Sequence, residues 1–143
     1  TLKKRKNMET RKVQAIIEKG RDGRYSVYMD NDDLDYLCTG TGASVESAKA
    51  DVLKAYEEMK GFYRKSGEVF QEADFEFVYD VPSFLQDFAN VFTLAGLSRL
   101  TGVNQKQLGH YISGYRHPSA ATTRKIEEGV KVFCDRLSKV KFA

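Results

Sequence analysis

The chain has 143 residues, of which 41% are hydrophobic and 30% are charged. This composition predicts one ordinary domain or two small ones and excludes an intrinsically disordered chain. No apolar run approaches the roughly 18 residues that cross a bilayer, and the charged start has no apolar segment behind it, so we expect no membrane partner. Cys38 and Cys134 lie far apart and outside any CxxC pair, which predicts a protein of the reducing cytoplasm with no disulfide framework and no structural zinc. We expect no other metal and no cofactor.

The net charge of +3 is unevenly distributed along the chain. Residues 81–143 hold nine Lys and Arg against four Asp and Glu, a net charge of +5, whereas residues 13–80 hold eight against fifteen, a net charge of −7. Residues 1–7 precede Met8, and their charge is given little weight. The basic part suits a polyanion and the acidic part suits a basic partner, although charge balance alone fits a solvated surface equally well.

The N-terminal part has the pattern of a small sheet with one helix. Apolar and polar residues alternate in several short segments, and a Gly-punctuated turn separates the first two, which predicts a β-hairpin. Ser44 can cap a helix whose apolar residues recur every three or four positions, with Gly67 beyond its end. The strands are expected at residues 12–19, 25–30, 37–42 and 74–79.

From Pro82 onward the strand pattern gives way to a helical one. Four helices are expected. The first is capped by Ser83 and carries apolar residues through Val91, and the second holds Leu94 to Leu100. The third runs from its cap Asn104 to Gly114, and the fourth begins at Ser119 and has an apolar stripe through Val140. Together these patterns predict an α+β fold. We expect a β-β-β-α-β domain at residues 8–80 and an all-α helix-turn-helix domain at residues 81–143.

The segment at residues 94–119 has the pattern of a DNA-binding helix-turn-helix. Gly102 permits a tight turn, Val103 can fill the gap between two helices, and Asn104 can cap the second helix. The polar start of that helix suits the major groove, where Gln pairs with adenine and Lys with guanine or phosphate. A plain helical bundle is the alternative. We expect DNA contacts from Asn104, Gln105, Lys106, Gln107, His110, Arg116, His117 and Arg124. Lys125, beside Arg124 near the start of the last helix, could likewise hold a phosphate.

An acidic loop follows the second expected strand, with carboxylates at Asp30, Asp32, Asp33 and Asp35. Clustered carboxylates can bind two metal ions for phosphodiester hydrolysis. Metal sites normally draw their ligands from several elements, whereas these four residues share one short loop. We therefore favour a solvated turn or a surface for a basic partner, and we expect no catalytic residues.

Two segments together resemble the HicB antitoxin family. The first is the hairpin IIEKGRDGRYSVYMD followed by GTGASVESAKADVLKAYEEM, and the second is LAGLSRLTGVNQKQLGHYISGYRHPS. The resemblance covers about residues 10 to 140. It implies a partial RNase H-like N-terminal domain, a helix-turn-helix tail, and no catalysis, because the family domain lacks a complete acidic site. Many members carry a Pro-Asp-Leu-Pro-Gly-Cys-like stretch where this chain has DNDDLDYLC, so the toxin-facing details of the loop at Asp30, Asp32, Asp33 and Asp35 differ here.

The resemblance also implies the antitoxin role in a type II toxin–antitoxin pair. The partner is then a HicA-type toxin, a small basic mRNA-cleaving protein, and the helix-turn-helix binds operator DNA as an autorepressor. We expect a homodimer or higher homo-oligomer, because such proteins usually bind paired half-sites. The apolar spacing of the last helix suits either dimerisation or closure of its own core. A regulator without a toxin, whose N-terminal domain senses a ligand or dimerises, and a metal-dependent nuclease are the alternatives.

Overall fold

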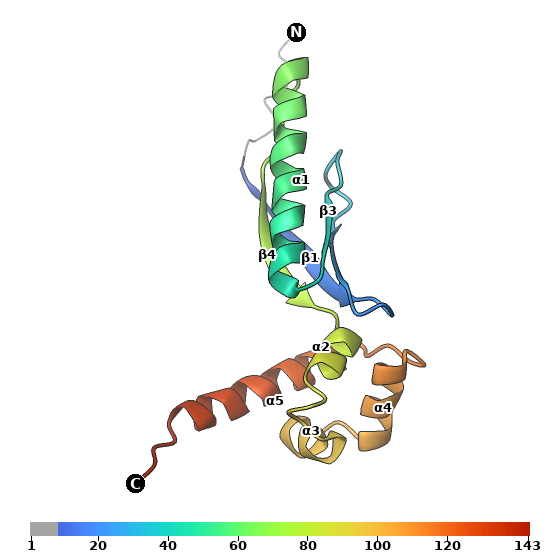
Figure 1. The fold of residues 1–143 in the computed structure, drawn as a ribbon, viewed down its shortest axis with the longest axis vertical. Helices are drawn as coiled ribbons and strands as arrows, with labels where there is room; N and C mark the ends of the chain where they lie inside the picture. The colour runs from blue at the N-terminus through green and yellow to red at the C-terminus, as the bar shows by residue number, and fades with distance from the viewer. Residues whose placement is uncertain (1–8) are drawn as a thin grey trace. The chain divides into compact units, whose positions relative to one another are not determined.

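A computed structural model describes residues 9–143, which form two compact units that meet in the sequence between Asp80 and Val81 (Figure 1). The described residues fold into a four-stranded mixed sheet and five helices, which confirms the predicted α+β class. Residues 1–7 and Met8, where the first domain is expected to begin, lie outside the described residues. Among residues 9–143, each helix is too short or too polar to cross a membrane.

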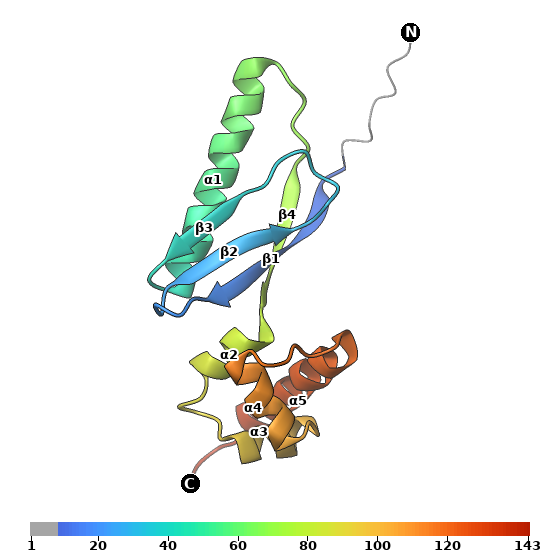
Figure 2. The same ribbon diagram turned by 90° about the vertical axis from the view of Figure 1, so that its right-hand side faces the viewer.

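The first unit is a sheet in the order β3-β2-β1-β4, whose strands Figure 2 shows side by side. β1 pairs antiparallel with β2, β2 pairs antiparallel with β3, and β4 pairs parallel with β1. Helix α1 connects β3 to β4 and forms part of the crossover that the parallel pairing of β4 with β1 requires. The elements are β1 (Arg11–Lys19), β2 (Tyr25–Asp30), β3 (Thr39–Gly42), α1 (Val45–Ser66) and β4 (Ala73–Tyr79).

The core of this unit lies between the sheet and α1. The alternation in the strands turns Val13, Ile17 and Val27 inward, where they are almost completely buried. α1 contributes Val52 and other residues of the apolar stripe predicted from the sequence. The third strand is shorter than the expected 37–42 and begins at Thr39. Its glycines permit a close approach of α1, because a Cβ atom on Gly40 would collide with the backbone of Val52.

Both ends of α1 are as the sequence predicts. Ser44 accepts a hydrogen bond from the backbone N of Ser47, and the Ser47 hydroxyl in turn accepts one from the backbone N of Ser44. This reciprocal pair stabilises the first turn by satisfying two donors that the helix leaves unpaired. Gly67 ends the helix in the left-handed conformation, with φ of 72°.

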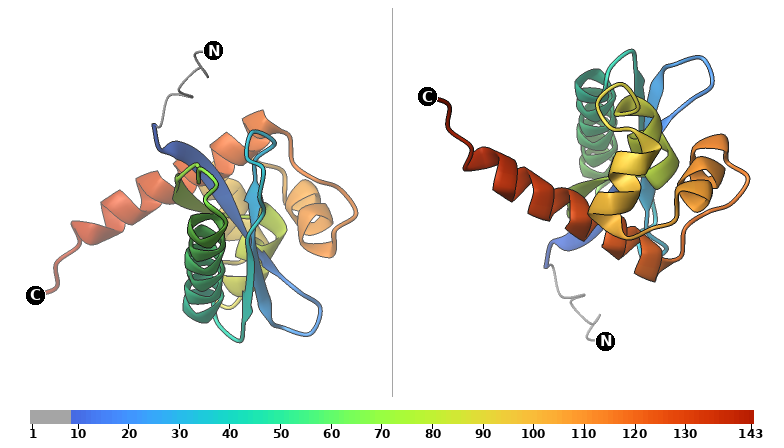
Figure 3. Two further views of the ribbon diagram at one scale, coloured as in Figure 1. Left: turned by 90° about the horizontal axis from the view of Figure 1, so that it is seen from above. Right: turned by 90° about the horizontal axis from the view of Figure 1, so that it is seen from below.

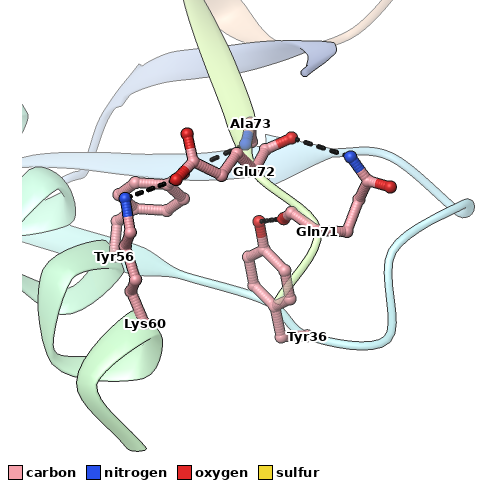
Figure 4. A network of polar contacts seen from close by, with 6 residues as sticks. All are labelled: Tyr36, Tyr56, Lys60, Gln71, Glu72 and Ala73. Carbon is pink, nitrogen blue, oxygen red and sulfur yellow. Dashed lines mark hydrogen bonds and ion pairs between the residues drawn. The ribbon is translucent and has the colours of Figure 1, made fainter. Parts of the chain in front are cut away.

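A polar network joins the start of β4 to α1 and to the acidic loop (Figure 4). The Tyr56 hydroxyl accepts a hydrogen bond from the backbone N of Ala73 at 3.0 Å. The Tyr36 hydroxyl donates to the carbonyl of Gln71 at 2.6 Å, and the Tyr36 ring stacks on Phe70 at 4.7 Å between centroids. Burial, more than the neighbouring groups, raises the pKa of Tyr36. The C-terminal end of the acidic loop is therefore anchored.

The second unit is entirely helical within the described residues and consists of α2 (Val81–Asp87), α3 (Leu94–Thr101), α4 (Gln105–Ser113) and α5 (Ala120–Ser138). The prediction that Ser83 caps a helix reaching Val91 is wrong. α2 begins two residues earlier, and Ser83 is buried within it. Pro82 fits the first turn, where its missing N–H has no intrahelical acceptor to lose. The helix ends at Asp87, and Val91 is exposed.

The core of the second unit gathers residues from each of its four helices and from the α3–α4 turn. α5 packs closely on α3 at Gly129, where a Cβ atom would collide with the carbonyl oxygen of Leu100. The C-terminal part of α5 extends away from α2, α3 and α4 (Figure 1), so Leu137 is exposed there and Val140 lies beyond the helix end. The buried residues are Leu85, Leu97, Val103, Leu108, Tyr111 and Ile126.

Candidate nucleic-acid interface

The turn between α3 and α4 is short and internally bonded. The buried hydroxyl of Thr101 donates to the carbonyl of Leu97 at 2.7 Å and accepts from the backbone N of Val103 at 3.2 Å. Gly102 adopts the left-handed conformation with φ of 72°, and Val103 is buried between the helices. These contacts agree with the roles that the sequence predicts for Gly102 and Val103, and they fix the direction in which α4 leaves the turn.

The N-terminal end of α4 presents polar side chains to solvent. Asn104 caps the helix, because its side-chain oxygen accepts a hydrogen bond from the backbone N of Lys106 at 2.8 Å. Gln105, Lys106 and Gln107 are exposed, whereas Leu108 is completely buried beneath them. The cap therefore holds three exposed polar side chains on the first turn of a helix whose opposite side is fixed in the core.

The C-terminal end of α4 folds back in a compact bend. Gly114 has φ of 76°, and the backbone N of Arg116 donates to the carbonyl of His110 at 3.3 Å. Tyr115, which is exposed, lies against His110 with ring centroids 5.0 Å apart, and the Arg116 guanidinium lies over the same ring at 5.7 Å. The bend thus returns Arg116 to the neighbourhood of the exposed side of α4.

A hollow of about 510 Å³ opens between the start of α4, the bend after it and the start of α5. Three of its side chains, Lys106, Arg116 and Lys125, are cationic, and none of its lining residues is acidic. Nδ1 of His110 is buried and finds no hydrogen-bond partner among the described residues. The hollow is lined by Gly102, Val103, Asn104, Lys106, Gln107, His110, Arg116, Thr122 and Lys125.

Two helix N-termini contribute to this hollow. α4 begins at Gln105, and α5 begins at Ala120 after the cap Ser119, whose hydroxyl accepts from the backbone N of Thr122 at 3.2 Å. The aligned peptide dipoles place partial positive charge at the N-terminal end of a helix. Together with the three cationic side chains, these ends make the hollow suited to an anion such as a phosphate group.

The structure brings five of the eight predicted DNA-contacting residues together around the hollow. Gln105, His117 and Arg124 are exposed but do not line it. The sequence pointed to a phosphate contact from Lys125, beside Arg124 near the start of the last helix, but it gave no role to Thr122 or Tyr115. The Ser119 cap places Lys125 in the first two turns of α5. The five predicted residues that line the hollow are Asn104, Lys106, Gln107, His110 and Arg116.

The acidic residues of the first unit lie elsewhere on the chain. Asp30 is the last residue of β2 and is exposed. Asp32, Asp33 and Asp35 are exposed in the loop before β3, where the backbone N of Asp33 donates to the side chain of Asn31 at 2.7 Å. Among residues 9–143, no three His, Cys, Asp or Glu side chains are grouped so that they could hold a metal ion.

Comparisons of the chain with protein-family models, with curated proteins and with solved structures find no match.

Proposed function

We propose that the second unit is a helix-turn-helix module that binds operator DNA. The cationic hollow carries this proposal, because it lies at the exposed N-terminal end of the one helix that the α3–α4 turn presents to solvent in this unit. A recognition helix enters the major groove with its N-terminal residues against the base edges, and phosphate contacts beside it set its register. The exposed polar first turn of α4 and the adjacent hollow match these two requirements.

In this account the two kinds of contact are divided between different residues. Gln105 and Gln107 read base edges, since a Gln side chain can donate to and accept from adenine at the same time. Arg116 and Lys125 hold a backbone phosphate in the hollow, which Lys106 also lines. His117 and Arg124, exposed outside the hollow, contribute to neighbouring phosphates.

The same proposal includes a homodimer or higher homo-oligomer. Operator half-sites about one helical turn apart are bound by paired recognition helices. The exposed Leu137 and Val140 at the end of α5 offer an apolar surface for such pairing. Sedimentation velocity of the full chain, alone and with Leu137→Glu, measures this directly. A wild-type chain that sediments as a monomer throughout the micromolar range contradicts it.

We further propose that the first unit acts as the antitoxin against a HicA-type toxin and is not an enzyme. This rests on the resemblance to the HicB family and on the net charge of −7 over residues 13–80, which suits a basic partner. Co-expression with the product of each open reading frame that flanks this gene tests it. Restored growth and a purified complex support the antitoxin role, whereas DNA binding without any such partner leaves a plain regulator.

The DNA-binding proposal is tested by a mobility shift on the promoter fragment ahead of the chain's own gene. We expect a specific shift that a scrambled fragment of equal length does not compete away. Gln107→Ala should reduce the discrimination between the two fragments by about 1–3 kcal/mol, as the loss of one bidentate base contact does. Ser113→Ala, at the opposite end of α4, is the matched control and should leave discrimination unchanged. Equal competition by both fragments contradicts sequence-specific reading by α4.

A further inference from the structure

The sheet of the first unit has one face that α1 covers and one that it does not. α1 packs against the side chains that point inward from each strand, and Figure 3 shows the strands lying together on one side of α1. The alternating residues of the same strands point to the opposite face, where no other helix of this unit lies among the described residues. We call the surface formed by those alternating residues the outer face.

An apolar row runs across the outer face. The strand register aligns Val78 of β4 with Ile16 of β1, and Ile16 with Tyr28 of β2. Tyr28 is 36% exposed, and Ile16 and Val78 are half-buried. Three neighbouring strands therefore contribute one continuous apolar row, in a part of the chain where strand alternation otherwise turns polar residues outward.

Acidic side chains flank this row on both sides. On one side, Gln14 is aligned with Glu76 of β4 and with Asp30 of β2. On the other side, Glu18 of β1 is aligned with Ser26. The pKa of Tyr28 is raised, first by burial and then by the negative charges of Glu18 and two aspartates, Asp80 and Asp30. Carboxylates from either side therefore act on the phenol at the centre of the face.

We propose that the outer face is the docking surface for the basic toxin, which seats an apolar side chain on the Ile16–Tyr28–Val78 row and places Lys or Arg side chains over the flanking carboxylates. The inference rests on the proposed antitoxin function and assigns it to the sheet instead of the loop at Asp32, Asp33 and Asp35. An apolar centre with a charged rim is the usual anatomy of a protein interface, and the rim charges choose the partner.

The negative charge of the outer face favours some binding partners over others. A nucleic acid is repelled by the same carboxylates that attract a basic protein. A second copy of this chain would have to present its basic residues, and three of these, Lys106, Arg116 and Lys125, line the hollow already proposed to hold DNA. The partner that can place an apolar side chain on the row and cationic side chains over the acidic rim is therefore a separate basic protein.

The test is isothermal titration calorimetry of the full chain with a HicA-type toxin whose catalytic residue has been substituted. The face variant is Glu18→Lys with Glu76→Lys, and a second variant, Tyr28→Ala, removes the apolar centre without a charge change. The matched control is Glu57→Lys with Glu58→Lys, which makes the same change of net charge at exposed positions of α1. Circular dichroism melts establish that each variant is folded.

We expect each face variant to raise the Kd for the toxin at least about tenfold, with the control within about twofold of wild type. Wild-type binding that the face variants leave intact, or that the α1 control weakens as much, overturns the docking surface while the antitoxin function stands. A wild-type chain that does not bind the toxin overturns the antitoxin function, and the docking surface falls with it.

Discussion

The side-chain oxygen of Asn104 lies 2.8 Å from the backbone N of Lys106 and accepts its hydrogen bond. Asn104 was predicted both to cap α4 and to contact DNA, and this bond shows that its acceptor is engaged in the cap. Within the proposed site it therefore positions the residues that follow it, and Gln105 and Gln107 are the better candidates for base reading.

Substitutions at Asn104 separate the two roles. Asn104→Ala should lower the free energy of unfolding by about 1 kcal/mol, because the backbone N of Lys106 loses its acceptor, whereas Asn104→Ser should retain most of the stability. Asn104→Asp should keep the cap but weaken DNA binding, since it adds a negative charge beside the hollow. Urea unfolding and fluorescence anisotropy measure the two effects. Equal DNA affinity of the Asp and Ser variants contradicts the placement of DNA at this end of α4.

The contact between α5 and α3 predicts a strong effect at Gly129. A Cβ atom there would meet the carbonyl oxygen of Leu100 and lie 2.9 Å from the Cα of Thr101. Gly129→Ala should therefore destabilise the second unit by about 1–3 kcal/mol as the two helices separate. The control is Gly61→Ala in α1, where no atom lies within 4 Å of the new Cβ. This substitution should raise the free energy of unfolding by about 0.5–1 kcal/mol, because alanine favours the helix over glycine. Thermal melts that rank the two variants in reverse contradict the packing.

The hydroxyl of Tyr56 should be needed at the start of β4. Tyr56→Phe leaves the backbone N of Ala73 without its acceptor and should lower the free energy of unfolding by about 1–3 kcal/mol. Tyr115→Phe, at an exposed ring, is the control and should be neutral. Hydrogen exchange locates the effect: the amide of Ala73 should lose protection in Tyr56→Phe, and unchanged protection there argues against the bond.

The two cysteines should differ in reactivity. Cys38 is 2% exposed and burial raises the pKa of its thiol, whereas Cys134 is exposed on α5. A thiol reagent at mildly alkaline pH should label the folded chain at Cys134 and should reach Cys38 only on unfolding in guanidinium. Prompt labelling of Cys38 in the native Cys134→Ser variant is the result that contradicts the burial.

Alkaline pH should destabilise the first unit through Tyr36. Its pKa is raised in the folded chain above the ordinary value of 10.0, so the unfolded chain releases this proton first. The stabilisation from the neutral phenol is therefore complete below pH 10 and is lost as pH rises above it. Urea midpoints from pH 9 to 11 should fall more steeply for wild type than for Tyr36→Phe. Parallel slopes contradict this prediction.

The parts of the fold that depend on local chemistry could be predicted from the sequence. Ser44, Asn104 and Ser119 cap helices because their side-chain oxygens reach amides two or three residues away, and Gly67 and Gly114 end helices because only glycine adopts a positive φ without strain. These signals need no knowledge of the rest of the chain.

The parts that depend on tertiary packing could not. Ser83 resembles a cap by residue type, yet it is buried, and α2 begins before it. β3 begins only at Thr39, and α1 packs so closely on it that a Cβ atom on Gly40 would collide with the backbone of Val52, a contact between segments that no local pattern reveals. The cationic hollow likewise joins Arg116 to Lys125 from different elements. Each was expected to hold a phosphate, but no local pattern reveals that they line the same hollow or that Thr122 lies there too.

The salt dependence of binding shows whether the hollow holds a DNA phosphate. Fluorescence anisotropy with the promoter fragment over a range of KCl concentrations gives the slope of log K against log salt for each variant. Arg116→Ala and Lys125→Ala should each weaken binding and reduce the slope by about 1, the loss of one phosphate contact. Lys141→Ala, beyond the end of α5, should leave the slope unchanged. Equal slopes for all three variants and wild type would contradict the account.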